Sequence, residues 1–420
     1  MDKEPTLFVG VDWASREHQV CVIGAGAPQQ RAFAHDADGL GAMVAWLIDQ
    51  APAAGDIAVA IETPHGPVVE ALMDRGVAVF AINPKQLDRF RDRFSPAGAK
   101  DDRRDALVLA SSLKTDRHCF RRLETLDPLI VELREWSRMA DDLKDERTRL
   151  TNRIRQQLWR YFPQVLELTD DVGSEWFLDI LALVPTPGST AKLNAKKLAR
   201  ILSAHRIRRL SADDALAVLR RPALTVAAGT AEAASAHLLN VAERVRLVNR
   251  QIKDATRRLD ALTAAIAGPE PDEDAAPGQP VEQHDATILR SLPGVGRIVL
   301  ATLLAEAHHA IRGRDYHALR TLCGVAPVTK RSGKSCRVEM RQACSGRLRT
   351  AVYHWARVAT QHDARSRARY GALRARGHTH GRALRGVADR LLAVACAMLQ
   401  NRTAYDPSRQ SVVSATQKPA

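Results

Sequence analysis

A chain of 420 residues can bury a sizeable core and is somewhat long for one compact domain, so two or three units are expected. Its formal net charge of +14 favours a polyanionic partner, because each neutralised phosphate releases condensed counterions; a protein that is merely basic is the alternative. The N-terminus is polar, which argues against a signal peptide, and the six cysteines include no CxxC pair, which argues against a zinc site. Because there is also no apolar run long enough to span a membrane, the sequence predicts a cytoplasmic protein with no membrane partner.

The first part of the chain alternates short apolar runs with amphipathic segments. Strands are expected at residues 7–11, 19–23, 57–61 and 77–82, and helices at residues 40–48 and 68–73. Strands that alternate with helices predict a mixed or parallel sheet with helices packed against it. We expect this α/β unit to occupy residues 1–118.

Two long helical segments follow, in a middle region placed at residues 119–267. Apolar residues recur in steps of four and three from Leu129 to Ile154, with Arg147 interrupting, and again from Val241 to Leu262. Such spacing predicts an antiparallel helical hairpin or an oligomerising coiled coil, and an ordinary amphipathic helix packed on its own domain is the alternative. The insert at residues 166–230 is expected to be helical, with a basic patch around Lys192 to Arg209 that the sequence does not assign to any chemistry.

The last third of the chain is set apart by composition. Residues 268–285 are acidic and rich in proline, which predicts a linker, and the tail at residues 407–420 is expected to be disordered. Residues 286–406 are expected to form a mainly α domain. Arginines are dense from Arg341 to Arg402, where Asp363 and Asp389 are the only acidic residues, so this part should carry much of the polyanion-binding surface.

Four acidic residues of the first unit are placed where they could meet. Asp12 and Glu62 directly follow expected strands, and strand ends project to one edge of a sheet. Asp102 and Asp105 are three residues apart at the start of an expected helix, on one face of it. Four converging carboxylates make sense chiefly around divalent cations, and hard oxygen ligands select Mg²⁺ or Mn²⁺. Such a site activates the attacking oxygen and stabilises the leaving oxygen of a phosphodiester.

Each acid also has an ordinary explanation. Asp102 and Asp105 could simply favour the positive end of the helix dipole, and any one of the four could be a solvated surface charge. The combination is more specific, because a GVD ending a first strand, a strand ending in Glu, and a D-x-x-D-A opening a helix together describe an RNase H-like nuclease core.

Two glycine-containing motifs mark the C-terminal domain. Residues 292–296 (LPGVG), followed by apolar residues at helical spacing, have the form of a helix-hairpin-helix, in which the turn at Gly294 and Gly296 exposes backbone N–H groups to phosphate; a plain helix turn is the alternative. Further on, residues 330–334 (KRSGK) place Ser332 between glycine and three basic residues, a setting suited to holding a phosphate.

These motifs resemble a known family. Residues 9–12, 61–66, 82–84 and 100–106 resemble the DEDD-type transposases of insertion sequences, namely the IS-one-ten family, which includes the pilin-gene invertases. The resemblance implies a first domain like that of Holliday-junction resolvases, with Asp12, Glu62, Asp102 and Asp105 on its four acidic positions. Ser15 and Asp101 depart from the family pattern without touching a carboxylate.

The C-terminal motifs resemble the transposase domain of the same family, in which the serine of the S-G step is the implied nucleophile. It falls on Ser332, with Ser335 a rival candidate, and Ser332 would form a covalent phosphoserine–DNA intermediate. Cys344 stands where the family usually has glycine, which puts the local turn in doubt. The basic residues near this serine and at the next helix are expected to contact nucleic acid: Lys330, Arg331, Lys334, Arg347 and Arg349.

The resemblance also implies partners. It implies a DNA recombinase that acts on double-stranded DNA and is guided by a noncoding bridge RNA. The long linker and the two helical segments further suggest assembly as a homodimer or homotetramer. Two other functions remain open: a metal-dependent DNA junction endonuclease that uses water, and a noncatalytic nucleic-acid-binding protein. The first needs the acids but not Ser332, and the second needs neither.

Overall fold

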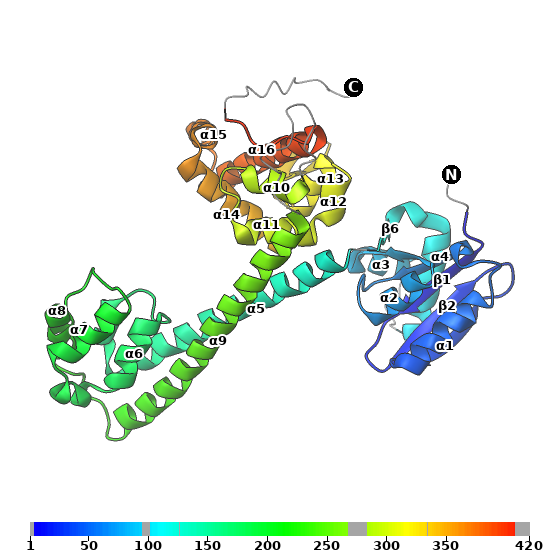
Figure 1. The fold of residues 1–420 in the computed structure, drawn as a ribbon. Helices are drawn as coiled ribbons and strands as arrows, with labels where there is room; N and C mark the ends of the chain where they lie inside the picture. The colour runs from blue at the N-terminus through cyan, green and yellow to red at the C-terminus, as the bar shows by residue number, and fades with distance from the viewer. Residues whose placement is uncertain (1–3, 95–100, 126, 268–283, 334, 408–420) are drawn as a thin grey trace, which may run out of the picture. The chain divides into compact units, whose positions relative to one another are not determined.

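The computed structural model describes residues 4–94, 101–125, 127–267, 284–333 and 335–407 (Figure 1). The chain divides into two compact units, Met1–Leu126 and Asp127–Ala420, which are treated separately below. The predicted linker, except for its last two residues, and the predicted tail, except for its first residue, lie outside the described residues. Within the described part, no helix is both long and apolar enough to span a bilayer.

The first unit is built on a six-stranded mixed sheet in the order β3-β2-β1-β4-β5-β6. The strands β1, β4 and β5 are parallel to one another, and the other neighbours are antiparallel. The strands are β1 (Leu7–Asp12), β2 (Glu17–Ile23), β3 (Gln29–Ala34), β4 (Ile57–Ile61), β5 (Ala78–Ala81) and β6 (Arg121–Arg122). The four predicted strands are confirmed, whereas β3 and β6 were not predicted, because β3 is an edge strand that buries only Phe33 and β6 is two arginines long.

Helices cover both faces of this sheet. On one face, α1 (Ala37–Ile48) and α2 (Pro67–Asp74) pack their buried apolar side chains on alternate residues of β1 and β4. On the other face, α3 (Pro84–Arg91) and α4 (Asp102–Asp116) cover Ala58 and Ala60 of β4. Two short 3₁₀ turns, η1 (Ala54–Asp56) and η2 (Arg117–Cys119), connect these elements. This mixed α/β arrangement is consistent with an RNase H-like fold.

The second unit begins with two long helices that pack antiparallel on each other. They are α5 (Pro128–Tyr161) and α9 (Thr230–Ala267). Arg258, near the end of α9, donates to Glu132, near the start of α5, at 2.8 Å, and Arg244 lies 3.5 Å from Glu146. The insert between them is helical as predicted, and consists of η3 (Pro163–Leu168), α6 (Glu175–Leu183), η4 (Pro187–Lys192), α7 (Ala195–Ala204) and α8 (Ala212–Leu219).

The helix pair takes part in two separate hydrophobic cores. The insert packs on one end of the pair, around Leu150 to Tyr161 of α5 and the first half of α9. The C-terminal domain packs on the other end, around Leu133 and Ala140. Arg147, the residue that interrupts the apolar spacing, lies between the two cores, where it donates to Asn249 at 2.9 Å and to Asp171 at 2.9 Å.

The C-terminal domain is mainly helical, as predicted for this part of the chain, and contains one β-hairpin that was not predicted. Trp355 is fully buried at its centre, and its indole N–H donates to the carbonyl of Pro293 at 2.9 Å. The elements are α10 (Asp285–Ser291), α11 (Arg297–Glu306), α12 (His308–Arg312), α13 (Tyr316–Leu322), β7 (Val328–Ser332), β8 (Ser335–Glu339), α14 (Gly346–His362), α15 (Ala364–Ala375) and α16 (His380–Asn401).

Candidate functional site

Strand alternation places Asp12 and Glu62 on the same face of the sheet. In β1, Val9 and Val11 belong to the core beneath α1 and α2, so Gly10 and Asp12 belong to the opposite face, because side chains alternate along a strand. Glu62 directly follows β4, and continuing the alternation of that strand by one residue puts it on the face of Ala58 and Ala60. Since Val11 is in register with Ile61, Asp12 and Glu62 occupy the next position of two parallel neighbours.

The helix α4 lies directly on this face because Gly10 has no side chain. A Cβ at Gly10 would stand 2.0 Å from the carbonyl oxygen of Ala106 and 2.6 Å from the amide nitrogen of Ala110. Backbone therefore packs on backbone, and the first turn of α4, which carries Asp102 and Asp105, is held against the same face as Asp12. A glycine inside an apolar strand is the sequence signal for such close approach.

Asp105 is buried and paired with an arginine that the sequence does not single out. Its carboxylate is 1% exposed and accepts from Nε of Arg91 at 2.6 Å and from a terminal nitrogen of Arg91 at 2.8 Å. Hydrogen bonding to Asp105 raises the pKa of the Arg91 guanidinium, and the charges of Asp88 and Glu62 act in the same direction. Arg91 thus lies within the field of two of the four predicted acids.

The remaining acids are more exposed. Asp102 begins α4 and is exposed, while Asp12 is half-buried at the end of β1. Carboxylate oxygens suit Mg²⁺ or Mn²⁺. Within the part of the chain that the structure describes, however, no three acidic, histidine or cysteine side chains are grouped closely enough to hold a metal ion. Because Arg91 donates to both oxygens of the Asp105 carboxylate, a cation would have to compete with Arg91 for them.

The segment that follows Asp12 is held by a buried histidine. The Ala14 N–H donates to Nδ1 of His18 at 3.3 Å, and Nε2 of His18 lies 2.8 Å from Nδ1 of His35. Because Nδ1 of His18 accepts, its Nε2 carries the proton in the neutral ring and donates to His35. Burial, and then the nearby His35, lower the pKa of His18. Sequence reasoning missed this pair, because a histidine in a strand has no distinctive spacing.

Ser332 lies at the tip of the exposed hairpin formed by β7 and β8. The pairing ends at Ser332 opposite Ser335, so both serines flank a two-residue turn. Gly333 adopts φ +52°, the left-handed conformation that favours glycine at this position of a hairpin. Both serines are exposed. The structure thus presents Ser332 to solvent in the second unit, whereas the four acids belong to the first.

The basic residues predicted around Ser332 have different surroundings. Lys330 is bonded across the hairpin to Glu339 at 2.7 Å, Arg331 is exposed, and Lys334 lies outside the described residues. Arg347 donates to Ser137 at 3.0 Å and lies 3.1 Å from Asp141, so it ties α14 to α5.

Arg349 is also engaged within the chain. One of its terminal nitrogens donates to the carbonyls of Arg341 and Gln342 at 2.9 and 3.0 Å. Nearby, the side chain of Cys344 lies against Gly324, whose φ is +68°. The turn that was in doubt is therefore built around a cysteine packed on a glycine. Nucleic-acid contacts by Arg347 and Arg349 stay a prediction.

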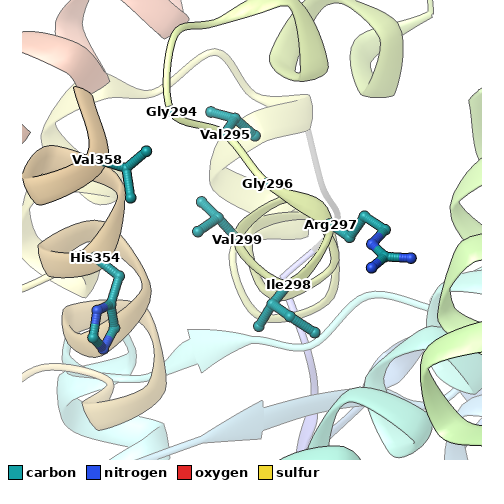
Figure 2. Close-up of a pocket in the computed structure, with 8 residues that line it drawn as sticks. All are labelled: Gly294, Val295, Gly296, Arg297, Ile298, Val299, His354 and Val358. Atoms are coloured by element: carbon teal, nitrogen blue, oxygen red, sulfur yellow. The ribbon is translucent and has the colours of Figure 1, made fainter. Parts of the chain in front are cut away.

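The turn of residues 292–296 joins α10 to α11 beside α14. Gly294 has φ +83°, and a Cβ there would stand 2.8 Å from the amide nitrogen of Ala359, so this glycine is required by packing. Gly296 is the N-cap of α11 and has open space around it. A shallow, mostly apolar hollow of about 410 Å³ lies between this turn and His354 and Val358 of α14, as Figure 2 shows.

Comparison with known proteins identifies the family. A family model described as a transposase matches residues 9–163, and a model of the transposase IS116/IS110/IS902 family matches residues 286–371. A Streptomyces coelicolor mini-circle protein, named as a transposase for IS117, is 32% identical over 414 residues, which cover 96% of each chain. The y4uE protein of Sinorhizobium fredii, also named as a transposase, is 56% identical over 216 residues, which cover 50% of this chain and 60% of that protein.

A further relative covers much of the chain. A protein of insertion element IS110 from Streptomyces coelicolor is 28% identical over 342 residues, which cover 79% of this chain and 78% of that protein. The resemblance inferred from the motifs is thus confirmed. The chain belongs to the IS110 (IS-one-ten) family of insertion-sequence transposases, enzymes that catalyse DNA strand transfer.

Proposed function

We propose that this transposase cuts and rejoins double-stranded DNA with an acidic site in its first unit and Ser332 as nucleophile. The proposal rests chiefly on one observation: Asp12 and Glu62 share a sheet face onto which α4, carrying Asp102 and Asp105, is packed through Gly10. If these acids were only surface charges, the start of α4 would have no reason to be packed against the ends of β1 and β4. The exposed hairpin at Ser332 supports the second part, because a nucleophile that attacks a duplex must reach out of its own domain.

The acidic face would hold Mg²⁺, with Mn²⁺ as a substitute, through Asp12, Glu62, Asp102 and Asp105. Bound there, the ion would supply Lewis-acid stabilisation of charge on the phosphate oxygens. The chain's own contribution is to hold the carboxylates in place: Gly10 fixes the helix, and Arg91 neutralises Asp105 when that carboxylate is not ligated.

Ser332 would attack the scissile phosphate. The Oγ–P bond forms, the Oγ proton is released, and one deoxyribose oxygen leaves as a hydroxyl after taking up a proton. The reverse reaction with a hydroxyl from another strand rejoins the DNA and frees the serine. Each exchange replaces one phosphodiester bond by another, so no external energy source is needed.

The test uses the two serines of the hairpin as a matched pair. Ser332→Ala should abolish a denaturation-resistant protein–DNA adduct, whereas Ser335→Ala, which removes the same hydroxyl from the paired position, should retain it. Cleavage at full rate in Ser332→Ala would favour the water-using junction endonuclease. Unchanged recombination in cells for Asp12→Ala or Glu62→Ala would favour the noncatalytic binding protein.

DNA would be positioned by backbone contacts around the C-terminal domain. We assign these to the turn at Gly294 and Gly296, read as a helix-hairpin-helix, and to Lys330, Arg331 and Lys334. Gly296 caps an α11 whose first turn holds no acidic residue, which leaves its positive end free to favour phosphate. Gly296→Ala places a methyl group in open space at the N-terminus of α11, where it would hinder a phosphate, so it should weaken DNA binding at no more than the small cost of a poorer N-cap.

The proposal extends to a bridge RNA and to assembly as a homodimer or homotetramer, in which the long helices would form a coiled coil between copies. RNA that copurifies with the protein and is required for strand transfer would support the first. For the second, mixing inactive Asp12→Asn with inactive Ser332→Ala should restore adduct formation if one copy's serine works with another copy's acids. No recovery in mixed samples that do associate would contradict shared sites.

A further inference from the structure

The insert carries a basic surface that the proposed chemistry does not use. Seven exposed cations and no acidic residue occur between residues 192 and 209, and one of the seven, Arg209, is hydrogen-bonded to Leu168 and Thr169. The other six define the arm patch: Lys192, Lys196, Lys197, Arg200, Arg206 and Arg208. Across the described part of the chain, none of their side chains forms an ion pair, whereas the insert's Arg221 is paired with Glu167 at 2.7 Å. A hollow of about 410 Å³ lies beside Arg206 and Arg208, at the end of α7.

Two local features of the arm patch work against the fold of the isolated chain. Lys196 and Lys197 occupy the first turn of α7, where the helix dipole disfavours positive charge and no acidic residue compensates. Arg206 adopts φ +56°, a left-handed conformation in which glycine is the favoured residue. Two lysines at the positive end of a helix and a long cationic side chain at a position that favours glycine are explained if a negatively charged partner binds them.

We infer that the arm patch binds the phosphodiester backbone of duplex DNA, at a site separate from the strand-transfer centre. Phosphates supply the missing negative charge, and lysine and arginine side chains on one helix face contact a backbone without reading its sequence. Residues 192–209 include no Phe, Tyr or Trp on which unpaired bases could stack, which favours a duplex over a single strand. The choice of DNA rests on the proposed function, in which DNA is the substrate.

The helix pair sets the reach of the arm patch. Ser137, which contacts Arg347 of the C-terminal domain, and Tyr161, whose hydroxyl donates to Pro185 of the insert, are both on α5. At about 1.5 Å per residue they are about 36 Å apart along the helix, close to one turn of B-form DNA. The insert and the C-terminal domain are therefore attached to α5 at points about one turn of B-form DNA apart, so the arm patch would contact backbone outside the DNA that the C-terminal domain holds.

The test removes three charges without loosening the fold. The patch variant Lys196→Ala/Lys197→Ala/Arg206→Gly takes cations from the three unfavourable positions, so its thermal stability should equal or exceed that of the parent. The control Arg221→Ala/Arg244→Ala/Arg257→Ala removes the same charge from residues that have acidic partners. Affinity for a random-sequence duplex of about 60 base pairs is measured against salt concentration, with full-length protein.

The patch variant should lower the slope of log affinity against log salt by about 2.7, as expected for three lost phosphate contacts, and shorten the stretch of DNA that the protein protects. The control should change the slope by less than one. Equal slopes for patch and control variants would overturn the inference, and so would a loss of affinity confined to RNA. Adduct formation through Ser332 is measured in parallel with the parent protein. An unchanged slope in the patch variant together with a normal parent adduct rejects only the arm patch, and a changed slope without any parent adduct rejects only the serine mechanism.

Discussion

The acidic face and the serine hairpin are held in place in opposite ways. The acids lie at the ends of two neighbouring strands and on a helix packed onto these strands at Gly10, with Asp105 buried. Ser332 ends a hairpin whose residues from Lys330 to Cys336, where described, are all exposed, and it is placed only by the pairing of β7 with β8. Packing fixes the first site, while backbone pairing and one glycine turn shape the second. A destabilising substitution near the acids should therefore affect the whole first unit, whereas one in the hairpin should affect only the hairpin.

The largest effect is expected from Arg91→Leu, which leaves the buried Asp105 carboxylate without its arginine. Breaking such a pair costs about 3–5 kcal/mol of unfolding free energy, because a buried charge is left uncompensated. Hydrogen exchange of β1 and α4 should report this loss, and added Mg²⁺ should recover part of it if the acids bind the ion. The control is Arg93→Leu, whose pair with Asp116 is exposed and should matter far less. Equal losses in the two variants would contradict the importance of the buried pair.

Gly10→Ala should destabilise the first unit by about 1–3 kcal/mol or more, because the new methyl group meets the backbone of α4. Strand transfer should fall as well, since α4 carries two of the acids. Gly41→Ala in α1 adds the same methyl group in open space and should be neutral or stabilising. Chemical denaturation followed by hydrogen exchange of β1 separates the two, and a tolerated Gly10→Ala would show that α4 is not held by this contact.

Gly333→Ala tests the hairpin by backbone conformation alone. The space around Gly333 is open, but its left-handed φ costs an alanine about 1–2 kcal/mol. We expect faster hydrogen exchange in β7 and β8, a lower adduct yield, and no change in the stability of α14 or α16. Gly333→Asn, which tolerates this conformation better, should recover most of the adduct. A global loss of stability would show that the hairpin is not an independent element.

The smallest effect concerns pH. The pKa of His18 is lowered in the folded chain from its ordinary value of 6.5, so the unfolded chain takes up the proton first as the pH falls below that value. The contribution of His18 to stability is therefore complete above about pH 7 and declines as the pH falls toward the lowered pKa. The melting temperature of the parent should fall more between about pH 7.5 and about pH 5.5 than that of His18→Gln. Parallel curves for the two proteins would contradict this assignment.

Sequence patterns predicted the parts of the first unit that alternate or recur. The four apolar strands follow from short apolar runs, and two of these runs end directly before an acid, which is why the sheet and a common edge for Asp12 and Glu62 could be expected. The pair of Arg91 and Asp105 joins two helices that no spacing links, so it has no signature in the sequence. The hairpin was missed because β7 and β8 carry charged side chains and bury almost nothing.

The same reasoning explains the arginines. Arg347 reads as a surface cation in a basic stretch, yet its partner Ser137 lies 210 residues away in α5. Only the fold brings them together. Basic composition therefore predicts a polyanion partner for the whole chain, but it does not separate residues that hold the protein together from residues that are free to contact DNA.

The antiparallel pairing of α5 with α9 makes the distance between the insert and the C-terminal domain adjustable. The two hydrophobic cores adjoin around Arg147 and share Leu143, so a heptad taken from each helix there would keep the apolar spacing on which both cores rest. Losing seven residues from each would draw the cores together by about 10 Å while roughly preserving the facing sides. Relatives whose helix pair differs in length would then contact stretches of DNA of different length while catalysing the same reaction.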